Sequence, residues 1–265
     1  MIIWTISNQK GGVGKTTTAV SIGGLLAQQG KSVLLMDLDP QGSLTSYFRL
    51  DPDGIENSVY TLFNTKASGK ALDSLDSLLH PTCVDGLTLM PASTAMATLD
   101  RQLGARDGMG LVIADALKRL SDRFDYVLMD CPPMLGILMV NALAACQQLL
   151  IPVQTEFLAL KGLERMLHTL KMISKARGGN LAYTIIPTFF DRRTRASTDA
   201  LRSMRDQYGD YLWSRVIPVD TQFREASRNG IPISLHCPSA RGTEAYASLV
   251  RWLQAGSEPS ARVAS

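Results

Sequence analysis

The sequence predicts an α/β fold, with a doubly wound and mostly parallel β-sheet that carries helices on both faces. Short apolar runs rich in β-branched residues alternate along the 265 residues with longer stretches of helical periodicity. Most of these runs are apolar throughout, which is typical of strands buried on both faces of a parallel sheet. Alternation of this kind implies right-handed crossover connections, which place helices on both sides of the sheet.

Seven strands and seven helices are expected. The strands are predicted at 2–7, 32–37, 87–91, 126–130, 149–153, 181–189 and 216–218. The helices are predicted at 15–29, 92–103, 110–120, 136–145, 158–176, 197–207 and 239–254, and Gly30 is expected to cap the first of them. No repeat or linker divides the chain, so a single domain over residues 1–255 is expected. The small and polar residues 256–265 are predicted to form a disordered tail.

Composition excludes several classes of protein. The chain is 45% hydrophobic and 19% charged, so it can bury a sizeable core. No apolar run approaches the ~20 residues of a membrane span, and no secretory leader opens the chain, so a cytoplasmic protein without membrane insertion is expected. The cysteines, Cys83, Cys131, Cys146 and Cys237, have irregular spacings that indicate buried thiols rather than a zinc site or disulfides. A net charge of +3 does not by itself indicate a nucleic-acid binder.

A glycine-rich run, Lys-Gly-Gly-Val-Gly-Lys-Thr-Thr at 10–17, follows a predicted strand and opens a predicted helix. That context is the one a P-loop requires, because backbone amides and the helix N-terminus then surround phosphate groups. Lys15 is expected to reach the β- and γ-phosphates of ATP, and the Thr16 hydroxyl to bind Mg²⁺. The residues predicted to bind nucleotide here are Gly11, Gly12, Val13, Gly14, Lys15, Thr16 and Thr17.

Three carboxylates follow predicted strands. Asp37 and Asp39 come after the second strand, and Asp130 ends the run Tyr126-Val-Leu-Met-Asp. A hydrophobic strand followed by an aspartate has the form of a Walker B element, so Asp130 is expected to hold a Mg²⁺-bound water. The metal site is predicted at Thr16, Asp37 and Asp130. A structural reading of Asp37 and Asp39, as parts of an Asp-Pro turn, stays open.

Lys10 precedes the first glycine, where an ordinary P-loop requires no cation. The sequence here resembles the deviant Walker A ATPases, the class that contains ParA, MinD and the nitrogenase iron protein. The resemblance implies that Lys10 acts in trans, reaching the partner's phosphates across a dimer that encloses ATP. It also implies that Asp39 is the hydrolysis residue, so that Lys10, Lys15 and Asp39 form the catalytic set, and that Asp37 supports the metal.

Further motifs narrow the resemblance to short, Soj-like ParA proteins. They lie at 141–143, 151–163, 190–194, 217–218 and 230–233. MinD lacks the Asp-Pro-Gln-Gly of residues 39–42 and ends in an amphipathic membrane helix, and the iron protein needs cluster cysteines that we do not find. No helix-turn-helix segment precedes the P-loop. The resemblance implies that Pro218 and Asp220 lie at the adenine, and that Glu156 approaches the partner's nucleotide.

Basic residues gather late in the chain. From 192 to 228 there are eight arginines and five acidic residues, a local excess of +3. ParA-type dimers bind DNA without sequence preference, so the resemblance implies DNA contacts. We expect them at Arg192, Arg193, Arg195, Arg224 and Arg228, and the alternative is a solvated charged face. Val219 and Gln222 occupy two places where ParA proteins commonly carry arginine, which weakens the comparison with the family's DNA contacts.

The leading hypothesis is therefore a ParA-like ATPase that dimerises with ATP and positions a cargo, which is a DNA locus or a protein assembly at the nucleoid or a cell pole. A ParB-like activator is the expected partner. The opening Met-Ile-Ile-Trp-Thr-Ile-Ser-Asn-Gln-Lys resembles the ParC-like branch that places chemotaxis arrays, so an array protein is an alternative partner. An ATP-gated adaptor without DNA binding and a small-molecule kinase stay open as other functions.

Overall fold

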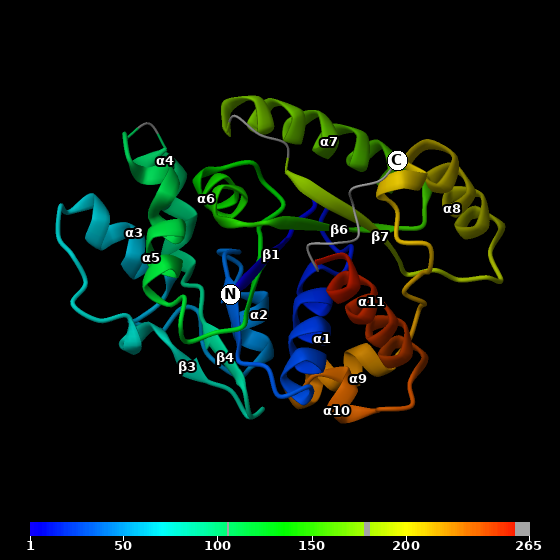
Figure 1. The fold of residues 1–265 in the computed structure, drawn as a ribbon, viewed down its shortest axis with the longest axis horizontal. Helices are drawn as coiled ribbons and strands as arrows, with labels where there is room; N and C mark the ends of the chain where they lie inside the picture. Colours follow the sequence, from blue (N-terminus) through cyan, green and yellow to red (C-terminus); the bar gives the residue numbers. More distant parts are fainter. Residues whose placement is uncertain (105, 178–180, 258–265) are drawn as a thin grey trace.

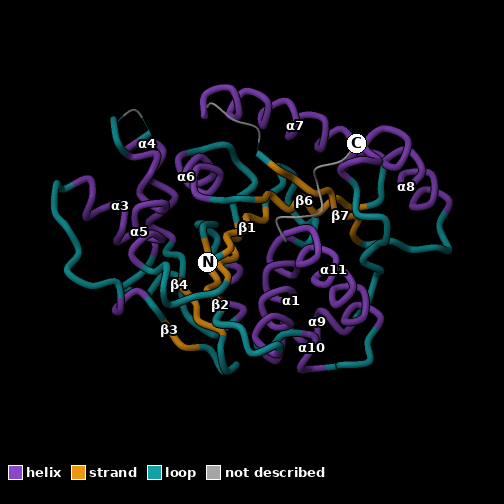
Figure 2. The backbone as a smooth tube through the Cα atoms, viewed as in Figure 1, coloured by secondary structure: helices purple, strands orange, loops and turns teal. Residues whose placement is uncertain are grey.

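The computed structural model describes residues 1–104, 106–177 and 181–257, which form a seven-stranded sheet with helices on both faces (Figure 1, Figure 2). The strand order is β3-β4-β2-β5-β1-β6-β7. Every neighbouring pair is parallel except β3 and β4. The strands are β1 (Ile2–Ile6), β2 (Val33–Asp37), β3 (His80–Pro81), β4 (Leu87–Met90), β5 (Tyr126–Asp130), β6 (Gln148–Gln154) and β7 (Ala182–Thr188). The predicted fold class is confirmed.

Helices connect the strands in the described residues. They are α1 (Lys15–Gln28), α2 (Ser43–Tyr47), α3 (Val59–Ala67), α4 (Leu99–Leu103), α5 (Val112–Arg119), α6 (Ile137–Ala145), α7 (Phe157–Arg177), α8 (Arg195–Tyr208), α9 (Gln222–Asn229), α10 (Ile233–His236) and α11 (Arg241–Ser257). Single 3₁₀ turns lie at Asp76–Leu78, Thr94–Thr98, Met109–Leu111 and Gly209–Tyr211. None of the helices in the described part of the chain is long and apolar enough to cross a membrane.

The two faces of the sheet have separate cores, because successive strand residues point in opposite directions. Leu35 and Leu128 pack against α1 and α11 on one face. Leu34 and Val127, one residue earlier in each strand, join the core formed with α3 to α8 on the other face. Figure 1 shows α1, α9, α10 and α11 together on one side of the sheet. Asp37 and Asp130 share the strand direction of Leu35 and Leu128, so their side chains point toward α1.

The predicted strand at 216–218 is wrong. This segment runs beside β7 but makes only an isolated bridge, between Phe190 and Pro218. Phe189, predicted as the last residue of β7, has a left-handed φ of 52°, which breaks the extended backbone. Pro218 has no N–H to donate, so a regular ladder cannot form there.

Other boundaries also differ from the prediction. The predicted helix at 92–103 is a 3₁₀ turn followed by the short α4, and α2, α3, α9, α10 and the antiparallel β3 were not predicted. Cys83 is exposed and Cys237 only half-buried, against the prediction, whereas Cys131 and Cys146 are buried as expected. Helix α11 continues through Gly256 to Ser257, into the first two residues of the predicted tail. The rest of that tail, 258–265, lies outside the described residues.

Candidate functional site

The sequence-predicted site residues meet where β1, β2 and β5 end. The three strands are neighbours in the sheet, and Asp37 of β2 lies opposite Asp130 of β5 in the register. Ile6, at the end of β1, lies opposite Asp130 on the other side. Since ligands of doubly wound sheets bind at the carboxyl ends of the strands, this edge is the expected place for a nucleotide.

The motif at 10–17 spans the end of the loop between β1 and α1 and the first turn of α1, and the loop turns through its glycines. Gly12 and Gly14 have φ values of 73° and 91°, a region in which side chains other than glycine are strained. Gly11 and Gly12 have open space beyond them, so a ligand can approach the backbone closely. Thr188, at the end of β7, donates a hydrogen bond of 2.9 Å to the carbonyl of Val13. The sheet itself therefore holds the loop in its curved shape.

Asn8 anchors the other end of the loop. Its buried amide donates a 2.7 Å hydrogen bond to the carbonyl of Pro152 in β6, and its side-chain oxygen accepts one from the backbone N–H of Lys10. Neither Asn8 nor Thr188 was singled out from the sequence. Both act through backbone atoms of residues far away in the chain, so the motif carries no signal for them. Together they preorganise the loop for phosphate.

Asp130 and Thr16 form the core of the predicted metal site. The Thr16 hydroxyl donates to Oδ2 of Asp130 at 2.6 Å. Oδ1 of Asp130 is buried and has no hydrogen-bond partner within the described residues. A buried carboxylate oxygen without a donor fits a cation or a cation-bound water. The described residues contain no cluster of three acidic, His or Cys side chains that could hold a metal.

Asp37, the second predicted metal residue, is held entirely by protein donors. Its Oδ2 accepts hydrogen bonds from the backbone N–H and the hydroxyl of Thr45, at 2.8 and 2.7 Å. Its Oδ1 accepts a third from the backbone N–H of Asp39. The Thr45 hydroxyl in turn accepts from the N–H of Ala92. Asp37 therefore fixes α2 and the exit from β4 beside the site, and its role at a metal stays a prediction.

Asp39 lies two residues beyond the end of β2 and is largely buried, with 9% of its area exposed. Its Oδ1 accepts a hydrogen bond of 3.0 Å from the backbone N–H of Gln41, and its carbonyl accepts one from Gly42. The open structural reading as a turn residue is thus part of what Asp39 does. Its Oδ2 makes no hydrogen bond among the described residues, so one oxygen is available to a water.

The two lysines of the loop have different surroundings. Lys15 is nearly buried, and its ammonium lies 3.4 Å from the carbonyl oxygen of Lys10. Lys10 is about a quarter exposed and forms an ion pair with Glu156, which immediately precedes α7. The structure therefore brings together two residues that the resemblance assigns to the dimer. In the single chain, the two side chains pair with each other.

The predicted adenine residues lie in the segment that follows α8 and precedes α9. Pro218 borders a pocket beside Phe190. Asp220 has both carboxylate oxygens engaged, because Oδ1 accepts from the backbone N–H of Gln222 and Oδ2 from that of Gly242, each at 3.0 Å. These N–H groups lie at the starts of α9 and α11, so Asp220 caps two helices.

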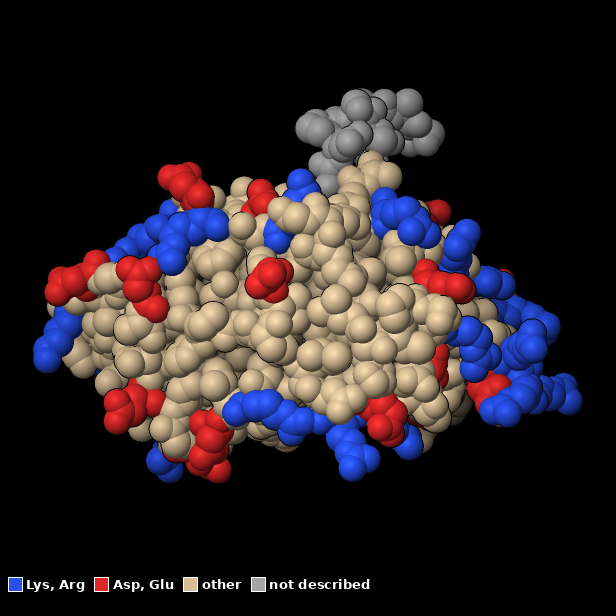
Figure 3. Space-filling model, turned by 90° about the horizontal axis from the view of Figure 1, so that it is seen from below, with Lys and Arg blue, Asp and Glu red and all other residues tan. Residues whose placement is uncertain are grey.

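The predicted DNA contacts divide into two groups. Arg193 is bound by both oxygens of Asp191, and Arg195 pairs with Asp199 at 3.4 Å. Arg192, Arg224 and Arg228 are exposed and make no ion pair within the described residues. Figure 3 shows Lys and Arg side chains gathered at the right-hand end of the molecule, where α8 lies.

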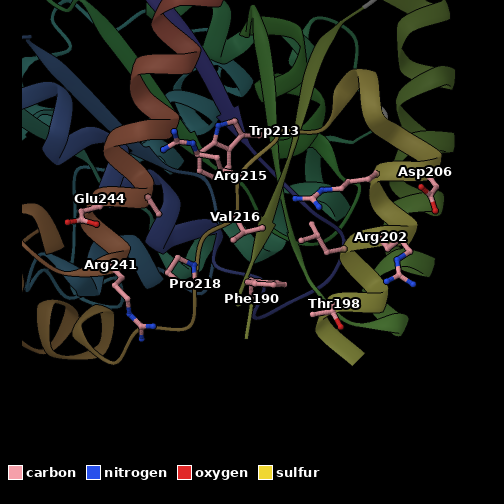
Figure 4. Close-up of a pocket in the computed structure, with 13 residues that line it drawn as sticks. Phe190, Thr198, Arg202, Asp206, Trp213, Arg215, Val216, Pro218, Arg241 and Glu244 are labelled. Carbon is pink, nitrogen blue, oxygen red and sulfur yellow. The ribbon is translucent and has the colours of Figure 1, made fainter. Parts of the chain in front are cut away.

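A pocket of about 730 Å³ lies between α8, α11 and the segment 213–218. Figure 4 shows its lining residues coming from these three parts of the chain. Apolar side chains, including Trp213 and Val216, form part of the wall. Its arginines are Arg202, Arg205, Arg215 and Arg241. We counted the first three within the basic stretch but did not place them together, because they become neighbours only when α8 packs beside the segment after β7.

Burial makes the paired carboxylates of the site hard to ionise. It is the largest cause that raises the pKa of Asp130 to about 8, and the negative charge of Asp37 adds to it. The Thr16 hydroxyl and the Lys15 ammonium act in the opposite direction. Burial likewise raises the pKa of Asp37 to about 7, against the hydrogen bonds from Thr45. A bound cation would stabilise the ionised forms of both groups.

We predict that the nucleotide-free, Mg²⁺-free protein loses stability as the pH rises from 6 to 8.5. The pKa values of Asp37 and Asp130 are higher in the folded chain than in the unfolded one, so unfolding releases protons and becomes easier at higher pH. Asp130→Asn should retain about 1–3 kcal/mol more of the stability at pH 8.5 than the wild type does. Denaturant melts at several pH values measure this, with the exposed Asp122→Asn as the control. Parallel pH curves for wild type and Asp130→Asn would contradict the prediction.

Comparison with known proteins agrees with this site. A family model described as "AAA domain" matches residues 1–183. The sporulation initiation inhibitor protein Soj of Bacillus subtilis is 36% identical over 94% of this chain and 96% of its own length. The chromosome partitioning protein ParA of Myxococcus xanthus is 34% identical over 96% of this chain and 88% of its own.

A solved structure from Mycobacterium smegmatis, described as cobyrinic acid a,c-diamide synthase with bound ADP and magnesium, is also similar. It is 33% identical, covers 96% of this chain and 94% of its own, and superposes with a TM-score of 0.79. The residues that the family model matches include the phosphate loop and the carboxylates Asp37 and Asp130. The similarity to Soj and ParA extends over nearly the whole chain. The chain therefore belongs to the ParA/MinD-type family of P-loop ATPases.

Proposed function

We propose that this ATPase is a switch that binds ATP with Mg²⁺, closes into a dimer around two nucleotides, and resets by hydrolysis. The preorganised loop 10–17, the nearly buried Lys15 and the unpartnered Oδ1 of Asp130 support nucleotide and Mg²⁺ binding. The proposal of a dimer rests on Lys10. This lysine precedes the first glycine of the loop, at a position where an ordinary P-loop needs no cation. The resemblance to deviant Walker A ATPases gives that lysine its role in trans.

The surface around Lys10 supports a second copy as the partner. A groove of about 640 Å³ lies beside Lys10 and is lined by Met134, Leu135 and Leu158, among others. Met134 and Leu158 are 72% and 69% exposed. Apolar side chains grouped in this way on a surface are typical of an interaction site. We therefore place the dimer interface on this face of the molecule.

The ion pair between Lys10 and Glu156 adds a condition to the dimer. Both side chains of the pair are partly exposed, at 28% and 39%. Ion pairs at a protein surface are typically worth about 0–1 kcal/mol, so a phosphate group can replace Glu156 at the lysine at little cost. Glu156 is then released toward the partner's nucleotide, as the resemblance implies. In this account the pair keeps Lys10 in a defined position before ATP arrives.

We predict that Lys10→Ala retains ADP binding but stays monomeric with Mg²⁺-ATP, because the substitution removes the interaction made in trans and the ion pair to Glu156 but leaves Lys15 and the loop glycines unchanged. Light scattering after size-exclusion chromatography, with and without ATP, measures the change. Lys70→Ala, at an exposed lysine away from the groove, serves as the control. A normal ATP-dependent dimer of Lys10→Ala would rule out the trans role.

We further propose that the dimer positions its cargo through nonspecific binding to DNA. The basic end of the molecule and the arginine-lined pocket beside α8 support this, since arginine forks bind phosphate oxygens well. Because Arg193 is held by Asp191 and Arg195 pairs with Asp199 at 3.4 Å, Arg192 and Arg205 are the better candidates. Arg202 is a further candidate, since its ion pair with the same Asp199 is longer, at 3.9 Å. We propose a ParB-like protein as the activator of hydrolysis. We also propose that the ATP-bound dimer is located at the nucleoid.

An ATP-gated adaptor without DNA binding is the second candidate. Val219 stands where ParA proteins commonly carry arginine, and it is an exposed apolar side chain, 43% accessible. Such a surface suits a protein contact better than a phosphate contact. The adaptor would dock on a protein assembly at a cell pole, of which a chemotaxis array is one example.

One titration separates the two candidates. With ATP, we predict that the wild type binds nonspecific duplex DNA with a steep salt dependence. Arg192→Ala/Arg202→Ala/Arg205→Ala should lower the slope of log K against log salt by about 2–3, roughly one for each phosphate that the variant no longer neutralises. The control is Arg106→Ala/Arg119→Ala, at the α5 end of the molecule. No ATP-dependent binding at low salt would contradict the DNA proposal and favour the adaptor.

A further inference from the structure

The loop that follows Asp130 is fixed at both of its ends. Residues 131–136 connect β5 to α6. At the start, the backbone N–H of Cys131 donates to the carbonyl of Ile6 at 3.1 Å, which continues the sheet for one more residue. At the end, the backbone N–H of Ile137 donates to Oδ1 of Asp100 at 2.5 Å. Asp100 belongs to α4, outside the nucleotide site.

Gly136 shows how closely Asp100 approaches this loop. Its backbone is extended, with φ −143° and ψ −171°, a conformation that any residue can adopt. A Cβ at Gly136 would lie 2.6 Å from Cγ of Asp100 and would collide with the carboxylate. The missing side chain at Gly136 therefore makes room for the Asp100 carboxylate that caps α6.

The cap also sets the position of the exposed part of the loop. Met134 and Leu135 lie between the two fixed ends and line the groove beside Lys10. Helix α6 is tied to its neighbours further along, since Asn141 donates to the carbonyl of Met109 and accepts from the N–H of Ile113. The cap of Asp100 fixes the helix N-terminus, which is where the loop ends.

We propose that Asp100 is a positioning residue of the ATPase reaction, which holds loop 131–136 so that Asp130 and the Met134–Leu135 surface keep one relative arrangement. The proposal rests on the function proposed above. Asp100 does not touch the nucleotide in this account. It acts through the N-terminus of α6, whose free N–H groups and dipole favour a carboxylate. A shift of Met134 and Leu135 in the groove is thereby coupled to a shift of Asp130 in the nucleotide site.

The test begins with Asp100→Ala and Asp100→Asn. Removing the cap should shift the equilibrium between fixed and open loop by about fivefold, so amide exchange at 134–137 should speed up by that factor while β5 stays protected. ADP affinity and the KM for ATP should stay within about twofold, and kcat should fall about fivefold. Asp100→Asn, which retains an acceptor oxygen, should keep most of the amide protection and most of the kcat of the wild type. Asp107→Ala, at an exposed aspartate between α4 and α5, is the control.

A double-mutant cycle with Gly136→Ala tests the contact itself. Gly136→Ala alone should speed exchange and lower kcat, because the added Cβ displaces the carboxylate. In the Asp100→Ala background the same change should have little further effect. Full additivity of the two changes, or Asp100→Ala with unchanged exchange and kcat, would overturn the proposal. A wild type that does not hydrolyse ATP would instead contradict the proposed function, and amide exchange would still decide whether the cap holds the loop.

Discussion

Two buried carboxylates that lie side by side constrain the rest of this structure. Asp37 and Asp130 end neighbouring parallel strands in matching register, and both point toward α1. Water cannot reach them freely, so each must be protonated, hydrogen-bonded or paired with a cation. The sheet order places them next to the end of β1, where the phosphate loop begins. The fold therefore places two buried carboxylates, whose charge a cation can neutralise, at the edge of the sheet where the phosphate loop begins.

The surrounding residues divide that task between protein and ligand. Asp37 is satisfied by Thr45 and the backbone of Asp39, so it serves the architecture. Asp130 keeps one oxygen without a protein partner among the described residues, so it serves the ligand. Thr16 donates a hydrogen bond to Asp130 and the Lys15 ammonium lies near it, and we propose that the three residues together hold Mg²⁺ and phosphate. A ligand that brings its own phosphates and cation compensates the charges that the single chain leaves unmatched.

The sequence predicts the parts of this site that are local in the chain. The strand before each carboxylate and the Gly-Lys-Thr of the loop are continuous motifs, so Lys15, Thr16 and Asp130 can be recognised directly. Thr188 and Asn8 were missed, because they shape the loop through backbone atoms more than a hundred residues away. The arginine-lined pocket was missed because its residues become neighbours only when α8 and α11 pack beside the segment 213–218. The strand predicted at 216–218 failed because Phe189 and Pro218 interrupt pairing, which no apolar pattern reveals.

The central claim is that Asp130 and Thr16 complete a site for a nucleotide together with Mg²⁺. Calorimetric titration of ADP into the nucleotide-free wild type, with Mg²⁺ and with a chelator in its place, tests it most directly. The account predicts that Mg²⁺ tightens ADP binding by about tenfold or more, which corresponds to about 1.4 kcal/mol per factor of ten. Equal affinity for ADP with and without Mg²⁺ would contradict it.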